Sequence, residues 1–101
     1  MCESYLCCRE GNTPPPTDAL KAGYWGSYQC DLPERTFLSM LTNIKQKNPD
    51  MLFWTGDNSP HDIWQQTNEI VTNHTISLTR MIKETFADSP VKIYPCTGNH
   101  D

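Results

Sequence analysis

The sequence has little that would direct it into a membrane or onto nucleic acid. None of its apolar runs approaches the ~18 residues that a membrane-spanning helix needs. Its 8 Lys and Arg are outnumbered by 12 Asp and Glu, and this acidic balance argues against binding through nucleic-acid phosphates. The opening residues, 1–5, have neither the basic nor the apolar region of a secretory signal peptide, so we do not expect one there. A chain of 101 residues then leaves room for one domain at most.

Residues 1–30 show no helical or strand period, and they contain most of the cysteine. Pro14, Pro15 and Pro16 favour polyproline II and exclude a helix there. We predict a looped segment stapled by disulfides. Four cysteines lie in this segment and allow three pairings, none of which the spacing selects: Cys2, Cys7, Cys8 and Cys30. The fifth, Cys96, is left over.

The cysteines and one further motif also bear on the compartment. Asn73-His74-Thr75 fits the N-glycosylation pattern, which makes Asn73 a candidate modification site. Disulfides form and persist in oxidising compartments. Together they predict a lysosomal or extracellular protein that has passed through the secretory pathway.

Residues 31–101 alternate between helical and strand patterns. Asp31 is a candidate N-cap, Pro33 suits a first turn, and Glu34 occupies the capping-box position. Apolar residues then recur on one helical face: Phe37, Met40, Leu41 and Ile44. The pattern predicts a helix over about 32–47.

Two short apolar runs follow, at 51–54 and 91–94, and each predicts a strand. The first is continuous, which is typical of a strand buried on both faces. Between them a helical pattern covers about 62–86, with Asp62 as its candidate cap and a polar, Thr-rich middle. Two strands joined by a helix form a parallel, right-handed crossover. The expected fold class is therefore α/β, with α-β-α-β following the Cys-rich loop.

Each predicted strand is followed by a glycine and by polar side chains that can bind ligands. Because parallel strands end at the same edge of a sheet, we expect these side chains to converge: Asp57, His61, Asn99 and His100. Carboxylate, amide and imidazole groups suit zinc or manganese. A carboxylate can also bridge two ions about 3.5–4 Å apart, and a histidine off the metals can protonate a leaving alkoxide.

The two loop motifs resemble those of calcineurin-like metallophosphoesterases: Gly56-Asp57 and Gly98-Asn99-His100-Asp101. Further segments, above all 54–67, and also 24–26, 29–33 and 6–9, resemble the acid sphingomyelinase family. This resemblance implies a partial α/β/β/α sandwich. In it, residues 1–30 would be a Cys-rich looped insertion, and 31–101 the central, incomplete part of a catalytic domain.

The resemblance also implies roles for the candidate residues. Asp57 would bridge two zinc ions and Asn99 would bind one of them. His100 would lie beside the leaving group as proton donor or transition-state stabiliser, and His61 would assist from the opposing loop. The implied disulfides are Cys2–Cys7 and Cys8–Cys30. The implied reaction is hydrolysis of sphingomyelin to ceramide and phosphocholine.

The sequence departs from the family pattern in its metal ligands. It contains neither the Asp-x-His motif expected before Asp57 nor the His-x-His pair expected after Asp101. We therefore expect an internal piece of a longer enzyme, inactive alone, with lipid contact only in the full-length protein. Two alternatives stay open: a related phosphodiesterase acting on nucleotides, and a Cys-stapled binding module without catalysis.

Overall fold

The computed structural model describes Cys8, Thr17 and residues 21–101. The elements run in the order α1 (Glu34–Gln46), β1 (Met51–Trp54), the short 3₁₀ helix η2 (Ile63–Gln65), α2 (Asn68–Thr85) and β2 (Lys92–Pro95). This order confirms the predicted α/β class with α-β-α-β. The predicted boundary at residue 30 stays a prediction, since most of the segment before it lies outside the described residues.

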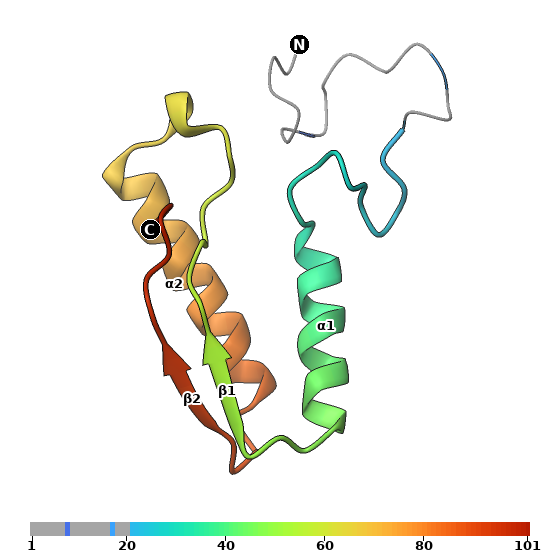
Figure 1. Cartoon of the computed structure of the whole chain (residues 1–101), viewed down its shortest axis with the longest axis vertical. Helices are drawn as coiled ribbons and strands as arrows, with labels where there is room; N and C mark the ends of the chain where they lie inside the picture. Colours follow the sequence, from blue (N-terminus) through green and yellow to red (C-terminus); the bar gives the residue numbers. More distant parts are fainter. Residues whose placement is uncertain (1–7, 9–16, 18–20) are drawn as a thin grey trace.

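The two strands pair in parallel, as predicted. Met51 lies opposite Lys92, and Phe53 lies opposite Tyr94. Consequently both strands point the same way, and the loops that follow them leave the sheet at one edge (Figure 1). The α2 crossover thereby places two polar loops side by side, although Asp57 of the first and Asn99 of the second are 42 residues apart in sequence.

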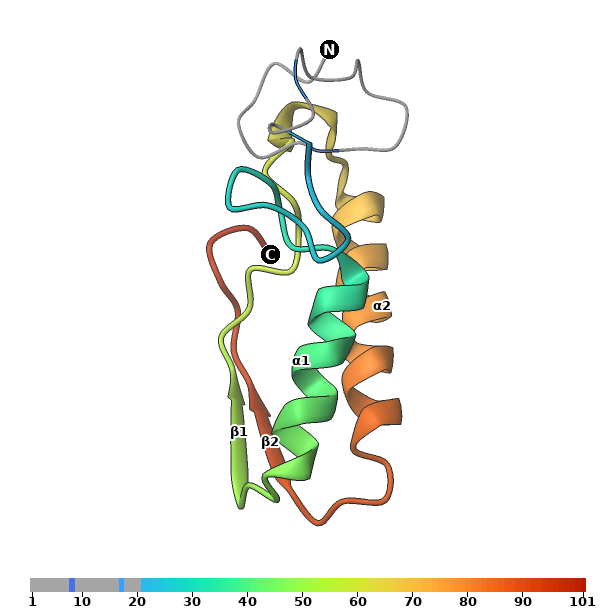
Figure 2. The ribbon, with the colours of Figure 1, turned by 90° about the vertical axis from the view of Figure 1, so that its right-hand side faces the viewer.

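The core lies between the helices and one face of the sheet. Figure 2 shows α1 and α2 on the same side of the two strands. The buried apolar side chains are Leu41 of α1 and Ile82 and Phe86 at the end of α2. Half-buried apolar neighbours surround them: Phe37, Ile44, Leu52, Trp54, Met81, Val91 and Ile93. Burial of these apolar side chains away from water stabilises the packing of both helices on the sheet. The position of the edge where the strands end is fixed by the same packing.

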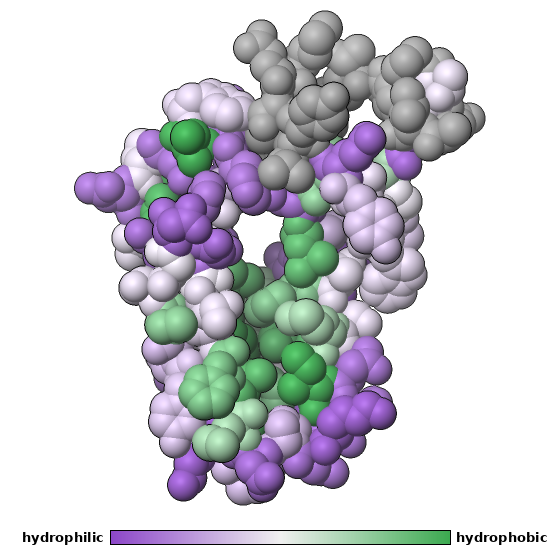
Figure 3. Space-filling view, in the orientation of Figure 1, coloured by the Kyte–Doolittle hydropathy of each residue, from purple (hydrophilic) through white to green (hydrophobic). Residues whose placement is uncertain are grey.

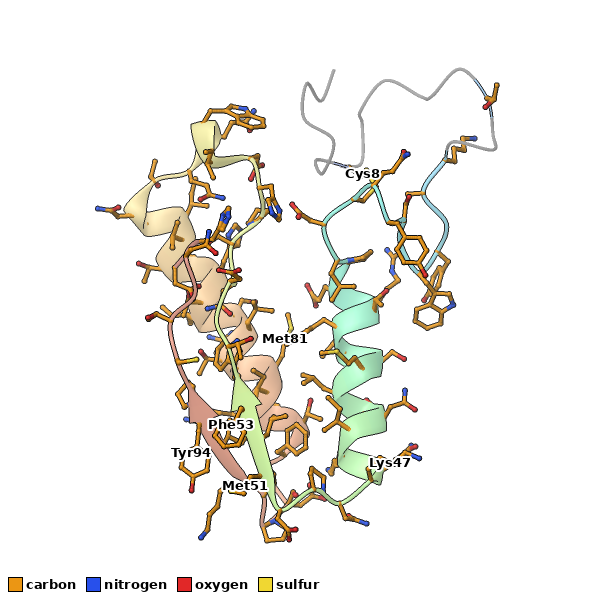
Figure 4. All side chains as sticks on the ribbon, in the orientation of Figure 1. Cys8, Lys47, Met51, Phe53, Met81 and Tyr94 are labelled. Carbon is orange, nitrogen blue, oxygen red and sulfur yellow. A yellow bond between two sulfur atoms is a disulfide. The ribbon has the colours of Figure 1, made fainter. Side chains whose placement is uncertain are left out.

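The other face of the sheet is exposed, so the prediction that 51–54 is buried on both faces is wrong for this chain. Met51 and Phe53 are 54% and 68% exposed, while Leu52 and Trp54, which alternate with them, turn inward. Phe53 stacks on Tyr94 with ring centroids 5.5 Å apart (Figure 4). The apolar surface over the strands is visible in Figure 3. The reason is that both helices pack against the same face.

Both predicted helix starts need correction. Pro33, not Asp31, is the N-cap of α1, and no side chain caps this helix. Proline fixes the extended entry, while the Asp31 carboxylate is used elsewhere, as described below. The second helix begins at Asn68 instead of 62, because Thr67 caps it by accepting the Ile70 N–H at 3.2 Å.

The polar, Thr-rich middle of the second pattern forms unbroken helix from Asn68 to Thr85. The threonine hydroxyls donate to the backbone carbonyl four residues earlier, as Thr72 does to Asn68 and Thr79 to Thr75. This local bonding satisfies the hydroxyls without breaking the helix. Among the helices that the structure describes, none combines the length and the apolar character needed to cross a membrane.

Candidate active site

Two glycines allow the loops after β1 and β2 to touch. Gly56 has φ of +77°, and a Cβ placed on it would lie 2.0 Å from the Gly98 backbone nitrogen. A Cβ on Gly98 would lie 2.2 Å from a carboxylate oxygen of Asp57. Neither position has room for a side chain, and the left-handed backbone at Gly56 favours glycine as well. The glycines therefore bring Asp57 and residues 99–101 into one cluster.

The Asp101 carboxylate ties the two loops together. Its Oδ2 accepts backbone N–H groups of Asp57 and Gly98 at 2.9 and 2.7 Å. Its Oδ1 accepts the backbone and side-chain nitrogens of Asn58 at 2.9 and 2.6 Å. Burial acts to raise the pKa of Asp101, but the bonds from Gly98, Asn58 and Asp57 outweigh it, so the pKa lies below its usual value.

This lowered pKa predicts that the loop junction weakens in acid. The ionised carboxylate accepts the four bonds, so its stabilisation is present above the unfolded pKa of about 3.9 and is lost as pH falls through the lower folded value. We expect the Gly98 and Asn58 amide resonances to shift together in that window. Asp101→Asn should remove this pH dependence. A titration that is the same in both proteins would contradict this role for Asp101.

Asp57 lies at the centre of the cluster, exposed and with φ of +61°. Its Oδ1 accepts the His100 backbone N–H at 3.1 Å. One terminal atom of the Asn99 amide lies 3.2 Å from each oxygen of the Asp57 carboxylate, and the other lies 3.2 Å from Nε2 of His100. With its nitrogen toward Asp57, the amide hydrogen-bonds both neighbours. With its oxygen toward Asp57, three oxygens converge, and a cation between them would stabilise that arrangement.

The donor set at Asp57 therefore fits part of a metal site. The Asp57 carboxylate and the Asn99 amide supply oxygen ligands from the two loops. Within residues 21–101 together with Cys8 and Thr17, no group of three or more His, Cys, Asp or Glu side chains is placed to hold an ion. A zinc site has about four ligands, so other residues would have to complete it.

The two candidate histidines also meet in this cluster. The rings of His61 and His100 lie 4.9 Å apart between centroids, tilted by 55°. His61 is held by Asp31: its backbone N–H donates to Oδ2 at 2.9 Å, and its ring Nδ1 lies 2.6 Å from Oδ1. Thus the structure brings together the four residues that were predicted to converge after the two strands: Asp57, His61, Asn99 and His100.

The residues missed at this site are Asp31 and Asp101, both carboxylates that hold the loops and rings in place. Asp101 belongs to the 98–101 motif, so its proximity was a usable signal. Asp31 belongs to residues 29–33, which resemble the family, but nothing local connects it with His61, because their contact spans 30 residues. Its position before Pro33 instead suggested a helix cap.

A hollow of about 600 Å³ opens beside His100. It lies between η2, the first turns of α2 and the loop after β2. Its lining mixes apolar and polar side chains: Ile63, Gln66, Asn68, Val71, Thr72, Asn99, His100 and Asp101. The hollow therefore adjoins the cluster on the side of Asn99 and His100.

The cysteine framework next to the site is confirmed in part. Cys8 and Cys30 form a disulfide with Cα atoms 5.4 Å apart. The other implied pair, Cys2–Cys7, lies outside the described residues. Cys96 is a free, exposed thiol that donates to the Trp54 carbonyl at 3.4 Å. Asn73 lies exposed on α2, and its glycosylation stays a prediction.

Comparison with known proteins agrees with the resemblance. The chain is 43% identical over 102 residues to sphingomyelin phosphodiesterase of Bos taurus and 41% identical to that of Homo sapiens, covering 99% of this chain in both cases. This chain is homologous to part of the sphingomyelin phosphodiesterases. It spans about 16% of the length of these curated relatives. Acid sphingomyelinase-like phosphodiesterase 3b of Homo sapiens is 35% identical over 95% of the chain. No protein-family model matches.

Proposed function

We propose that this chain is part of the catalytic domain of a zinc-dependent phosphodiesterase that hydrolyses sphingomyelin to ceramide and phosphocholine. One observation carries the proposal. Asp57, Asn99, His61 and His100 gather at one sheet edge, in a chain homologous to sphingomyelin phosphodiesterases over 99% of its length. The chain covers only 16% of those relatives, so ligands and lipid contacts outside it belong to the same proposal.

Asp57 and Asn99 would hold the zinc. The proposed ions would neutralise phosphate oxygens and activate water, which is the chemistry that two-metal phosphoesterases use. The Asp57 carboxylate is oriented for this by the His100 backbone N–H at 3.1 Å. The Asn99 amide, placed between Asp57 and His100, would help to align the phosphate with both.

The two histidines would act on the leaving group. His100 reaches the Asn99 amide through Nε2, so it borders the place where the phosphodiester would bind. A protonated imidazole whose Nε2–H turns from the Asn99 amide to the bound phosphodiester can give its proton to the departing alkoxide of ceramide. His61, with its ring 4.9 Å away, would share that task or stabilise the charge. An acidic lysosomal or extracellular setting favours protonated imidazoles, and the Cys8–Cys30 disulfide supports the oxidising pathway.

The function is tested on the protein as its gene encodes it. We expect phosphocholine release from sphingomyelin that stops when zinc is chelated and returns when zinc is restored. A nucleoside triphosphate assayed in parallel decides between sphingomyelin and the alternative of a related phosphodiesterase acting on nucleotides. Hydrolysis of the nucleotide with sphingomyelin untouched would overturn the proposed substrate.

The isolated chain 1–101 is expected to show no zinc-dependent turnover. The described residues supply two oxygen ligands, whereas zinc sites have about four ligands and a supporting shell. The measurement is phosphodiester hydrolysis by purified 1–101 across a zinc titration, with Asp57→Ala as control. Turnover that depends on zinc and disappears in the control would contradict this expectation. A cooperative thermal transition without turnover would favour the binding-module alternative.

A further inference from the structure

The Asp31 carboxylate makes two contacts with a single residue of the site. Oδ2 accepts the backbone N–H of His61 at 2.9 Å, and Oδ1 lies 2.6 Å from its ring Nδ1. The Asp31 side chain is 18% exposed, whereas that of His61 is 48% exposed. The carboxylate is thus the sheltered partner and the imidazole remains open toward the site. Both the backbone and the ring of His61 are fixed by one group.

We propose that Asp31 is the positioning residue for His61, an inference that rests on the proposed function. A carboxylate facing Nδ1 keeps a proton on that nitrogen and holds the ring at one angle. Nε2 is then the nitrogen left for the phosphodiester. Within residues 21–101 the structure also places the His100 ring 4.9 Å from that of His61, and this imidazole offers no negative charge. The Asp31 carboxylate supplies the oriented acceptor at Nδ1.

The segment that carries Asp31 is braced on both sides. Cys30, the residue before it, is bonded to Cys8. The first turn of α1 holds the preceding loop through Arg35, which donates to the Tyr24 carbonyl at 2.7 Å, and through Thr36, which donates to the Trp25 carbonyl at 2.8 Å. A carboxylate on such a braced segment can set the geometry of a loop 30 residues away. The loop before α1 thereby becomes part of the site.

Replacing Asp31 with asparagine distinguishes two roles of the carboxylate: orienting the His61 ring, and holding the His61 loop through its backbone N–H. Asp31 offers two acceptor oxygens, one for the His61 backbone and one for Nδ1. Asparagine keeps only one acceptor, and its amide group is a donor. If its oxygen stays on the backbone N–H, its amide faces Nδ1 and favours the tautomer with the proton on Nε2. Loop bracing would survive, but the ring would present the wrong nitrogen.

The experiment compares wild type, Asp31→Asn and Asp50→Asn in the protein as its gene encodes it. We expect the ¹⁵N shifts of the His61 ring, assigned with His61→Ala, to show the proton on Nδ1 in wild type and to change only in Asp31→Asn. We expect kcat on sphingomyelin to fall about ten- to a hundredfold in that variant, with KM little changed. Asp50 is exposed beyond the opposite end of the strands, so its variant should match wild type.

Unchanged ring shifts and unchanged kcat in Asp31→Asn would overturn the inference, as would a rise in KM with kcat preserved. Asp31→Asn that loses zinc or unfolds would be replaced by Asp31→Ser, which still offers an acceptor to the backbone but no carboxylate. A wild-type protein without phosphodiesterase activity would overturn the proposed function instead. The ring shifts would then still decide whether Asp31 sets the tautomer of His61.

Discussion

Replacing Asp57 with asparagine is expected to abolish zinc binding at this edge and to lower phosphodiesterase activity at least about a thousandfold. The carboxylate is the charged ligand of the proposed site, and an amide cannot neutralise two cations. The substitution is chosen to spare the fold. Asp57 has φ of +61°, a conformation that asparagine also adopts readily, and the amide oxygen can still accept the His100 N–H. The loss would therefore reflect charge.

The measurement combines bound zinc, counted by elemental analysis, with the rate of phosphocholine release. Asp50→Asn is the matched control, because it removes the same charge from an exposed site between α1 and β1. Gly98 amide shifts report whether the loop junction survives in the variant. Full activity or full zinc content in Asp57→Asn would refute the assignment of Asp57 as the central ligand.

The periodic parts of this fold could be predicted from sequence because they depend on local patterning. Helix α1 and both strands lie within a residue or two of their predicted bounds. The parallel direction of the two strands was predicted from the long helical connection between them. The predicted starts of the two helices were wrong because a long-range contact in one case and a turn in the other replaced the expected local cap. Asp31 is engaged by His61, and the chain forms η2 before Thr67 caps α2.

The prediction that β1 is buried on both faces failed for a different reason. A continuous apolar run does not say which neighbours exist, and here the helices cover only the face of the sheet that carries Leu52 and Trp54, while Phe53 lies on the exposed face. The convergence of Asp57, His61, Asn99 and His100 was predictable, since parallel strands end together. The contacts that hold the cluster were not. Three of the four bonds of Asp101 come from backbone N–H groups, which every sequence has and no motif marks, and the fourth comes from the Asn58 side chain.

Alanine at Gly56 is expected to separate the two loops and to remove activity together with much of the local stability. Its Cβ would lie 2.0 Å from the Gly98 nitrogen, 2.4 Å from an Asp101 oxygen and 2.7 Å from the Thr97 carbonyl carbon. Two of these atoms are backbone, so no rotation of a side chain relieves the clash. The left-handed φ of +77° adds a cost of about 1–2 kcal/mol to an overpacking cost of about 1–3 kcal/mol.

Gly23→Ala is the matched control for this clash. A Cβ at Gly23 would meet only the Gly26 carbonyl oxygen, at an ordinary contact distance of 3.7 Å. We expect the control to keep wild-type activity and zinc content, while Gly56→Ala loses both and shows faster hydrogen exchange at the Gly98 and Asp57 amides. Helical circular dichroism should stay close to wild type in both, because α1 and α2 are held together by the core of Leu41, Ile82 and Phe86, which does not depend on this junction. If Gly56→Ala kept its zinc and its slow amide exchange, direct contact between the loops could not be what brings Asp57 to Asn99.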